Sequence, residues 1–216
     1  DDINYQEFAK ELDLISWDNY PCFGEGDNLE IAVETAFYHD VYRSMKDGKP
    51  FFMMESTPSL VNWHDVNKLP KPKMQTLASV QAVAHGSDSV QYFQLRKSRG
   101  GHEKFHGAVI DHTGSENTRV FKEVSQTGAV LEKLKDVTGT YCNSKVAVIY
   151  DWANARGVKH FCGYNNIHRD YLSECIKWYK PFWEQGISAD IISLDDDFSK
   201  YDLVIAPFIY MIKDET

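Results

Sequence analysis

A run of four apolar residues ends in a single acid at residues 51–55, Phe-Phe-Met-Met-Glu, and this segment restricts the possible folds more than any other. A short apolar run before a polar turn that contains proline is typical of a strand buried on both faces, as in a parallel sheet. Glu55 then lies at the carboxyl end of the strand, where barrels of parallel strands carry their catalytic groups. Such a carboxylate can also simply cap the turn, so its position alone leaves two interpretations open.

Strand-like and helical segments alternate through the first part of the chain. We expect strands at residues 12–17, 51–55 and 89–96, separated by helices at 28–46 and 72–85 whose apolar residues recur at helical spacing. A long loop from 98 to 117 and a helix from 118 to 135 complete this part. The alternating order predicts parallel strands joined by helical crossovers.

Turn-forming residues cluster at 136–144 and predict a domain boundary, with one domain at 1–140 and a second at 141–216. Strands are expected at 145–150, 189–193 and 201–206, with a helix at 169–184. This pattern predicts a second parallel α/β unit of the doubly wound kind. No glycine-rich phosphate motif follows residue 150, so we expect no nucleotide cofactor.

Composition predicts a packed globular protein, with 43% hydrophobic and 13% aromatic residues. The net charge of −9 and the lack of a basic run argue against a nucleic-acid partner. The four cysteines show no C-x-x-C pair, so neither a zinc site nor a disulfide framework is expected. With no membrane-spanning apolar stretch and no signal-like start, the sequence favours a cytoplasmic protein without a membrane partner.

Four further side chains are candidates for a binding site. Trp63 offers a flat apolar face of the kind that packs on a sugar ring, although an isolated Trp is more often a core residue. Glu103 and His106 are three residues apart and can face the same side if their loop contains a helical turn; otherwise they belong to a surface loop. Tyr20 follows the first strand and either donates a hydrogen bond to the acid or shapes a Tyr-Pro turn.

Two motifs carry a family resemblance: Met-Glu-Ser-Thr-Pro-Ser-Leu-Val-Asn-Trp at 54–63 and Gln-Leu-Arg-Lys-Ser-Arg-Gly-Gly-His-Glu-Lys-Phe-His-Gly at 94–107. They resemble glycoside hydrolase family 42, the retaining β-galactosidases, and the similarity extends from residues 16–21 to 204–212. It implies that Glu55 is the catalytic nucleophile, at the end of barrel strand seven. Trp63 would form the floor of the galactose subsite, Glu103 and His106 would bind galactose hydroxyls, and Tyr20 would hydrogen-bond the nucleophile. Neither a metal nor another cofactor is implied.

The resemblance also implies the architecture: the last three strands of a (β/α)8 barrel, followed by an incomplete, flavodoxin-like α/β trimerisation domain. The general acid, a Glu at the end of strand four, is expected upstream of residue 1. The chain is therefore expected to be an inactive fragment of a homotrimeric enzyme that cleaves terminal non-reducing β-D-galactosyl residues. A β-fucosidase, an α-L-arabinopyranosidase and a non-catalytic assembly module remain alternatives.

Overall fold

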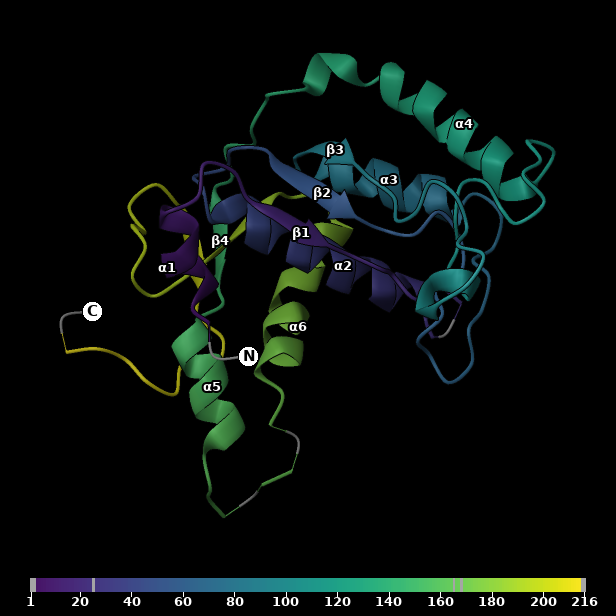
Figure 1. The fold of residues 1–216 in the computed structure, drawn as a ribbon. Coiled ribbons are helices and arrows are strands. Elements are labelled where there is room, and N and C mark those ends of the chain that lie inside the picture. The colour runs from purple at the N-terminus through teal and green to yellow at the C-terminus, as the bar shows by residue number, and fades with distance from the viewer. Residues whose placement is uncertain (1–2, 25, 165, 168, 215–216) are drawn as a thin grey trace.

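The computed structural model describes residues 3–24, 26–164, 166–167 and 169–214, and its strands form two small parallel sheets (Figure 1). The helices and strands of the first part are α1 (Tyr5–Lys10), β1 (Ser16–Asp18), α2 (Asn28–Ser44), β2 (Phe51–Glu55), α3 (Met74–Ala84), β3 (Ser87–Val90), the 3-10 helix η1 (His102–Phe105) and α4 (Arg119–Glu132). A second 3-10 helix η2 (Lys135–Val137) leads to β4 (Val146–Ile149), α5 (Trp152–His160), α6 (Tyr171–Glu184), β5 (Ala189–Ile192) and β6 (Leu203–Ile205).

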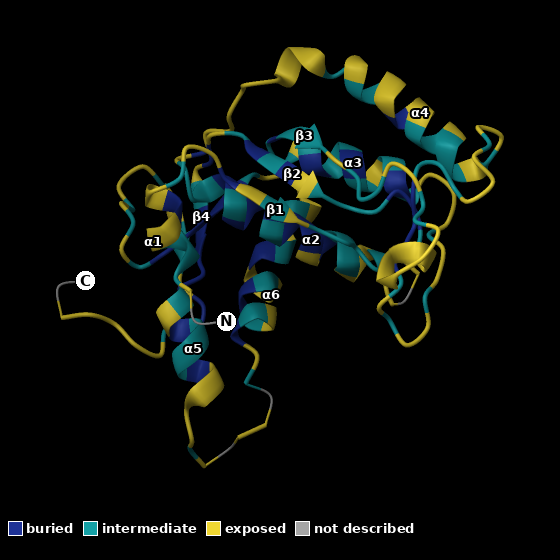
Figure 2. Cartoon of the chain, in the orientation of Figure 1, coloured by how far each residue is buried: buried dark blue, intermediate teal, exposed yellow. Residues whose placement is uncertain are grey.

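The first sheet has the order β1-β2-β3, so the strand that carries Glu55 lies in the middle. Phe51 and Met53 are buried, whereas Met54, which points to the other face, is 40% exposed. Helix α3 packs against β3, and α4 packs on α3 as an outer layer (Figure 1). Most of α4 remains exposed, and its buried Thr127 donates a hydrogen bond to Gln75 of α3 at 3.0 Å (Figure 2).

The second sheet has the order β5-β4-β6, in which β4 is central. All four residues of β5 and three of the four in β4 are buried, as expected for a strand covered on both faces. Helix α6 begins at Asp170, whose side chain accepts a hydrogen bond from the amide of Ser173 at 3.1 Å. Its buried residues Tyr171, Cys175 and Tyr179 join the core over this sheet. The predicted parallel α/β character of this part of the chain is therefore present.

Helix α2 packs against elements of both parts of the chain. Val33, Phe37 and Val41 share one buried core with residues of β4, β5 and α6. On another side of the helix, Tyr42 packs on the core formed around β1 and β2. The helix is therefore surrounded by protein, and it connects the two sheets (Figure 1).

A buried network of charges strengthens this connection. The guanidinium of Arg43, only 2% exposed, donates to Asp40 at 3.0 Å within α2 and to Asp190 of β5 at 2.8 Å. His85 lies 2.9 Å from the same Asp40 oxygen, and the Tyr179 hydroxyl donates to the other oxygen at 2.5 Å. Burial alone would raise the pKa of Asp40, but His85, Arg43 and Tyr179 together hold it at about 2. Asp40 therefore stays ionised, and its negative charge balances the buried guanidinium of Arg43.

Several elements differ from those that the sequence predicted. The short helix α1 and the helix α5 were not expected. The first strand begins at Ser16, because residues 12–15 form a bend, and the third strand ends at Val90, far short of residue 96. Beyond β3 the chain pairs with its own return segment: Arg96 bridges Ile110, and the amide of Val109 donates to the Gln94 carbonyl at 2.9 Å.

Candidate active site

The loops that follow β1 and β2 bring the candidate residues together at the carboxyl end of the first sheet. Asp18 of β1 is paired in register with Glu55 of β2, and the amide of Asn19 donates to the Glu55 carbonyl at 2.9 Å. This backbone bond fixes the turn in which Tyr20 lies. The side chain of Glu55 is half-buried and thus reachable from the sheet's open end.

The hydroxyl of Tyr20 donates a short hydrogen bond to one carboxylate oxygen of Glu55. Burial raises the pKa of the Tyr20 phenol above its usual range, and the neighbouring Glu55 carboxylate raises it further. The phenol therefore keeps its proton and acts as a donor. The Asp18 carboxyl also lies close to Glu55. Burial raises the pKa of Asp18, and the charge of Glu55 raises it further.

Three rings form an aromatic cup beside this pair. The ring of Trp63 meets Tyr20 edge-on at a centroid distance of 4.8 Å and lies 5.2 Å from the ring of His106. Phe93 contacts His106 from another side at 5.0 Å. His106 is fully buried, whereas Trp63 is 53% exposed, which is unusual for so large an apolar side chain in a packed core. Trp63 therefore presents a ring to the solvent beside Glu55 and Tyr20.

The orientation of the His106 imidazole follows from its hydrogen bonds. Nδ1 lies 2.9 Å from the carbonyl oxygen of Gly107, and because a carbonyl can only accept, Nδ1 carries the proton. Nε2 is buried and has no hydrogen-bond partner among the described residues. An unpaired buried nitrogen is unfavourable, so Nε2 can accept a hydrogen bond from any group that reaches it when the side chains covering it move.

Glu103 lies in η1, which provides the helical turn that its spacing from His106 requires: the amide of His106 donates to the Glu103 carbonyl at 3.1 Å. Asn62 ties this turn to the segment of Trp63, because its amide donates to the His102 carbonyl at 2.7 Å and to a Glu103 carboxylate oxygen at 3.5 Å. The Glu103 side chain remains exposed. Side-chain contacts thus link all five predicted residues, Glu103 through Asn62.

Gly107 holds the two loops against each other, and the sequence analysis did not single it out. A Cβ at this position would lie 2.4 Å from the Ser59 hydroxyl and 2.6 Å from the Leu60 carbonyl oxygen, closer than any side chain tolerates. The absence of a side chain therefore lets His106 approach Trp63. Phe93 and Asn62 were also missed, although both lie inside the two motifs or next to them.

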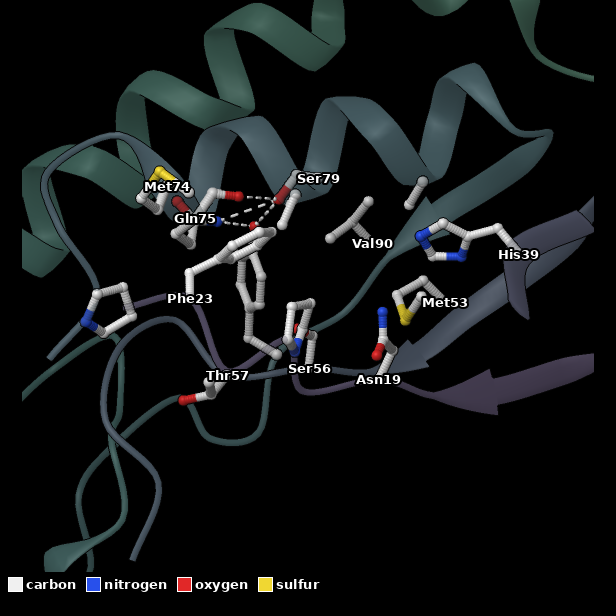
Figure 3. Close-up of a pocket in the computed structure, with 15 residues that line it drawn as sticks. Asn19, Phe23, His39, Met53, Ser56, Thr57, Met74, Gln75, Ser79 and Val90 are labelled. Atoms are coloured by element: carbon white, nitrogen blue, oxygen red, sulfur yellow. Dashed lines mark hydrogen bonds between the residues drawn. The ribbon is translucent and has the colours of Figure 1, made fainter. Parts of the chain in front are cut away.

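A small cavity of about 30 Å³ lies between the first sheet and α3 (Figure 3). Its lining includes Met53, Val90 and His39, and at its far end Gln75 and Ser79 are hydrogen-bonded to each other at 3.3 Å. The cavity has room for little more than one or two waters. It is too small for a sugar.

Two protein-family models match the chain. The family model described as beta-galactosidase of glycoside hydrolase family 42 matches residues 1–134, and the model described as beta-galactosidase trimerisation domain matches residues 144–216. The chain belongs to glycoside hydrolase family 42.

Curated relatives include the beta-galactosidase Pbg of Clostridium perfringens, 52% identical over 98% of this chain and 31% of that protein. Beta-galactosidase GalA of Bacillus licheniformis is 47% identical over 99% of this chain and 32% of its own length. The structure of the cold-adapted beta-galactosidase from Rahnella sp. R3 superposes with a TM-score of 0.95 at 48% identity and covers 98% of this chain and 31% of that one. The chain thus spans about a third of the length of these relatives.

For a membrane span and for a metal site, the structure covers only the described residues. No helix there is long and apolar enough to cross a membrane. The same residues contain no group of three or more His, Cys, Asp or Glu side chains that could hold a metal ion. The cytoplasmic location stays a prediction.

Proposed function

We propose that this chain is part of a retaining β-galactosidase and that Glu55 is its nucleophile. The observation that carries the proposal is the Glu55 carboxylate at the end of a buried parallel strand, hydrogen-bonded by a protonated Tyr20 and flanked by an exposed Trp63. Named relatives are beta-galactosidases, and one structurally similar family member, from G. stearothermophilus, is a catalytic mutant in which a glutamate is replaced by alanine.

In the first step, a Glu55 oxygen attacks the anomeric carbon of a terminal β-galactosyl residue. The bond from that carbon to the glycosidic oxygen breaks, and this oxygen takes a proton from a second carboxyl group. In the second step, the second carboxyl group, now ionised, takes a proton from water, the water oxygen attacks the anomeric carbon, and the bond to Glu55 breaks, which releases galactose with retained configuration. The Tyr20 hydroxyl holds one Glu55 oxygen and leaves the other for attack.

The remaining side chains fit recognition of the sugar. We assign stacking on the apolar face of galactose to Trp63, whose ring is half exposed beside Glu55. His106 offers an unpaired Nε2 to a sugar hydroxyl, and the exposed Glu103 accepts from one or two others. The Asn62 contacts and the close approach at Gly107 hold these groups in one cup.

The chain contributes to two domains of the proposed enzyme. Residues 1–140 contribute strands six to eight of a (β/α)8 barrel, and the general acid comes from strand four in a part of the enzyme outside these 216 residues. Residues 141–216 begin a flavodoxin-like trimerisation domain, and the whole enzyme is a homotrimer. The length of the relatives, the three-stranded sheet and the match to a trimerisation model support this arrangement.

The test is covalent labelling of the full-length enzyme with a 2-fluoro-galactoside, which traps the glycosyl-enzyme intermediate. Mass spectrometry should find the label on Glu55, and Glu55→Gln should lower turnover by several orders of magnitude while sugar binding persists. The matched control Glu132→Gln, at the exposed end of α4, should label and turn over normally.

A label on any other residue would overturn the assignment of Glu55. A substrate panel distinguishes the alternatives: faster cleavage of a β-fucoside or an α-L-arabinopyranoside would replace galactose as the substrate. Trimers that bind no sugar would favour the assembly module.

A further inference from the structure

A thiol and an imidazole face each other beside the aromatic cup. The Sγ of Cys22 lies 3.4 Å from Nε2 of His64. The two residues come from different loops: Cys22 follows β1 and Tyr20, whereas His64 follows β2 and comes directly after Trp63. Both side chains are half-buried, so they can be reached from solvent. The proposed function gives neither residue a role.

The spacing of the two atoms suits joint coordination of a metal ion. With a Zn–S bond of about 2.3 Å, a Zn–N bond of about 2.05 Å and a tetrahedral angle, sulfur and nitrogen lie about 3.6 Å apart. The observed 3.4 Å therefore requires only a small movement of either side chain. A linear ion such as Cu(I) would need the two atoms to lie more than about 4 Å apart, which fits less well.

The backbone of His64 is held in place before any ion binds. Its amide donates to Oδ1 of Asn67 at 3.1 Å, and Nδ2 of Asn67 donates to the His64 carbonyl at 3.2 Å. The Cys22 thiol lies 3.5 Å from the Tyr20 carbonyl oxygen, in the turn that Asn19 fixes against β2. Little ordering of the main chain is therefore needed on binding, which favours affinity.

We propose that Cys22 and His64 form a two-residue site for a thiophilic divalent cation, of which Zn²⁺ is the representative. On binding, the S–H bond of Cys22 breaks and its proton goes to solvent, while the sulfur and the neutral Nε2 of His64 each donate an electron pair to the ion. Because the described residues contain no group of three such ligands, water completes the coordination. The ion would be reversibly bound and would join the loops of Tyr20 and Trp63.

The first experiment requires no substitution of Cys22 or His64. In the full 216-residue chain, Zn²⁺ should slow alkylation of Cys22 by iodoacetamide, as measured by peptide mass spectrometry. Alkylation of the exposed Cys162, whose Sγ lies 3.9 Å from the His160 carbonyl oxygen, should be unaffected. Equal rates for Cys22 with and without Zn²⁺ would overturn the proposal.

A second experiment measures the bond to sulfur directly. In a Cys142→Ser/Cys162→Ser background, which removes the exposed thiols, Co²⁺ should produce a near-ultraviolet thiolate-to-metal absorption band that Zn²⁺ abolishes. Cys22→Ser should remove the band, and Cys22→Ser or His64→Gln should each weaken Zn²⁺ binding at least about tenfold. The matched control His160→Gln, at the exposed end of α5, should bind like the background.

Circular dichroism should show that each variant is folded, with Cys22→Ala and His64→Asn as substitutes for any that is not. A band that persists without the Cys22 sulfur, or unchanged affinity in both single variants, would overturn the site. Because the readouts are absorption, metal binding and alkylation, the result does not depend on galactosidase activity.

Discussion

Substitution of Trp63 should affect galactoside binding much more than the stability of the fold. Its ring is 53% exposed, so Trp63→Ala should remove little buried surface but should weaken galactoside binding by about 1–3 kcal/mol through lost stacking. Titration calorimetry and thermal unfolding of the full-length enzyme measure the two effects. Trp17→Ala is the matched control, because Trp17 stacks on Tyr42 at 4.7 Å within the core and its loss should cost about 3–5 kcal/mol of stability. Trp63 would be a core residue if its removal lowered stability as much and left binding unchanged.

His39 should make the stability of the chain depend on pH. Burial lowers the pKa of this imidazole to about 3, and neither ring nitrogen has a partner among the described residues. The unfolded chain takes up the proton near pH 6.5, whereas the folded chain takes it up only near pH 3, so acid favours unfolding throughout this window. Between about pH 7 and about pH 5, His39 should lower the free energy of unfolding by about 2 kcal/mol.

The variant His39→Phe keeps a ring stacked on Phe51, 5.5 Å away, and removes the titrating group. Urea unfolding of this variant should show a flatter pH dependence than the parent. The exposed His112→Phe should keep the parental slope. Parallel slopes for His39→Phe and the parent would contradict the burial argument. Asp40 does not interfere, because its lowered pKa of about 2 places its contribution at more acidic pH.

Sequence patterns picked out the side chains of the candidate site more readily than the residues that hold these side chains in place. Tyr20, Glu55 and Trp63 follow strands or lie in motifs, and the structure brings them together. Gly107 gave no separate signal, because a glycine in a loop is common and only the approach of Ser59 and Leu60 shows why it is needed. The His106 tautomer is likewise set by a carbonyl that only the folded chain places beside it.

At the scale of elements, Arg43 links α2 to β5. Arg43→Met should leave Asp40 and Asp190 as buried, uncompensated charges, at a cost of about 3–5 kcal/mol in the free energy of unfolding. Arg119→Met is the control, because Arg119 pairs with Glu123 on the partly exposed α4 and its loss should cost at most about 1 kcal/mol. Urea unfolding measures both.

The cost of Arg43→Met should fall when Asp40→Asn and Asp190→Asn are added, because the unpaired charges are then gone. Equal costs for Arg43→Met and Arg119→Met would contradict the role of the network. The substitution removes both contacts of Arg43 to β5, those with Asp190 and with the Ala189 carbonyl.

Long periodic elements were predictable and short ones were not. The pattern at 28–46 predicted α2 nearly to its bounds, and the apolar run at 51–55 predicted β2. Helix α5 was missed although Asp151 caps it with a hydrogen bond from Asn154 at 2.7 Å, because it is short and contains Gly157. A Cβ at Gly157 would lie 2.9 Å from the terminal methyl of Met211, a flexible side chain that only the folded structure places there. β3 was predicted too long because apolar residues beyond Val90 pack in a loop.

At the scale of the whole molecule, the two sheets share one buried helix, so neither should unfold independently of α2. The charge network of Arg43, Asp40 and Asp190 lies on the side of α2 that faces β5, whereas Glu55 lies at the end of the other sheet. The part that matches a trimerisation model is therefore packed directly onto the support of the candidate site.

The last prediction concerns activity of the chain by itself: the purified 216 residues should hydrolyse no nitrophenyl galactoside at any pH. A retaining mechanism needs two carboxyl groups about 5–5.5 Å apart, and we assign the second to a part of the enzyme outside this chain. In the described sheet β1 and β3 are edge strands, each with a single neighbour, and Met54 of the central strand is 40% exposed. Such edges favour association with further strands.

Adding the amino-terminal part of the enzyme should therefore restore hydrolysis by completing the barrel, and Glu55→Gln in this chain should abolish the restored activity. Size-exclusion chromatography should show the two pieces migrating together. Hydrolysis by the 216-residue chain alone, lost in its own Glu55→Gln variant and so not due to a contaminating enzyme, would place the acid within this sequence. The requirement for a second carboxyl group would then have to be met by a side chain close to Glu55, and Asp18, paired with it in register, would be the first to replace.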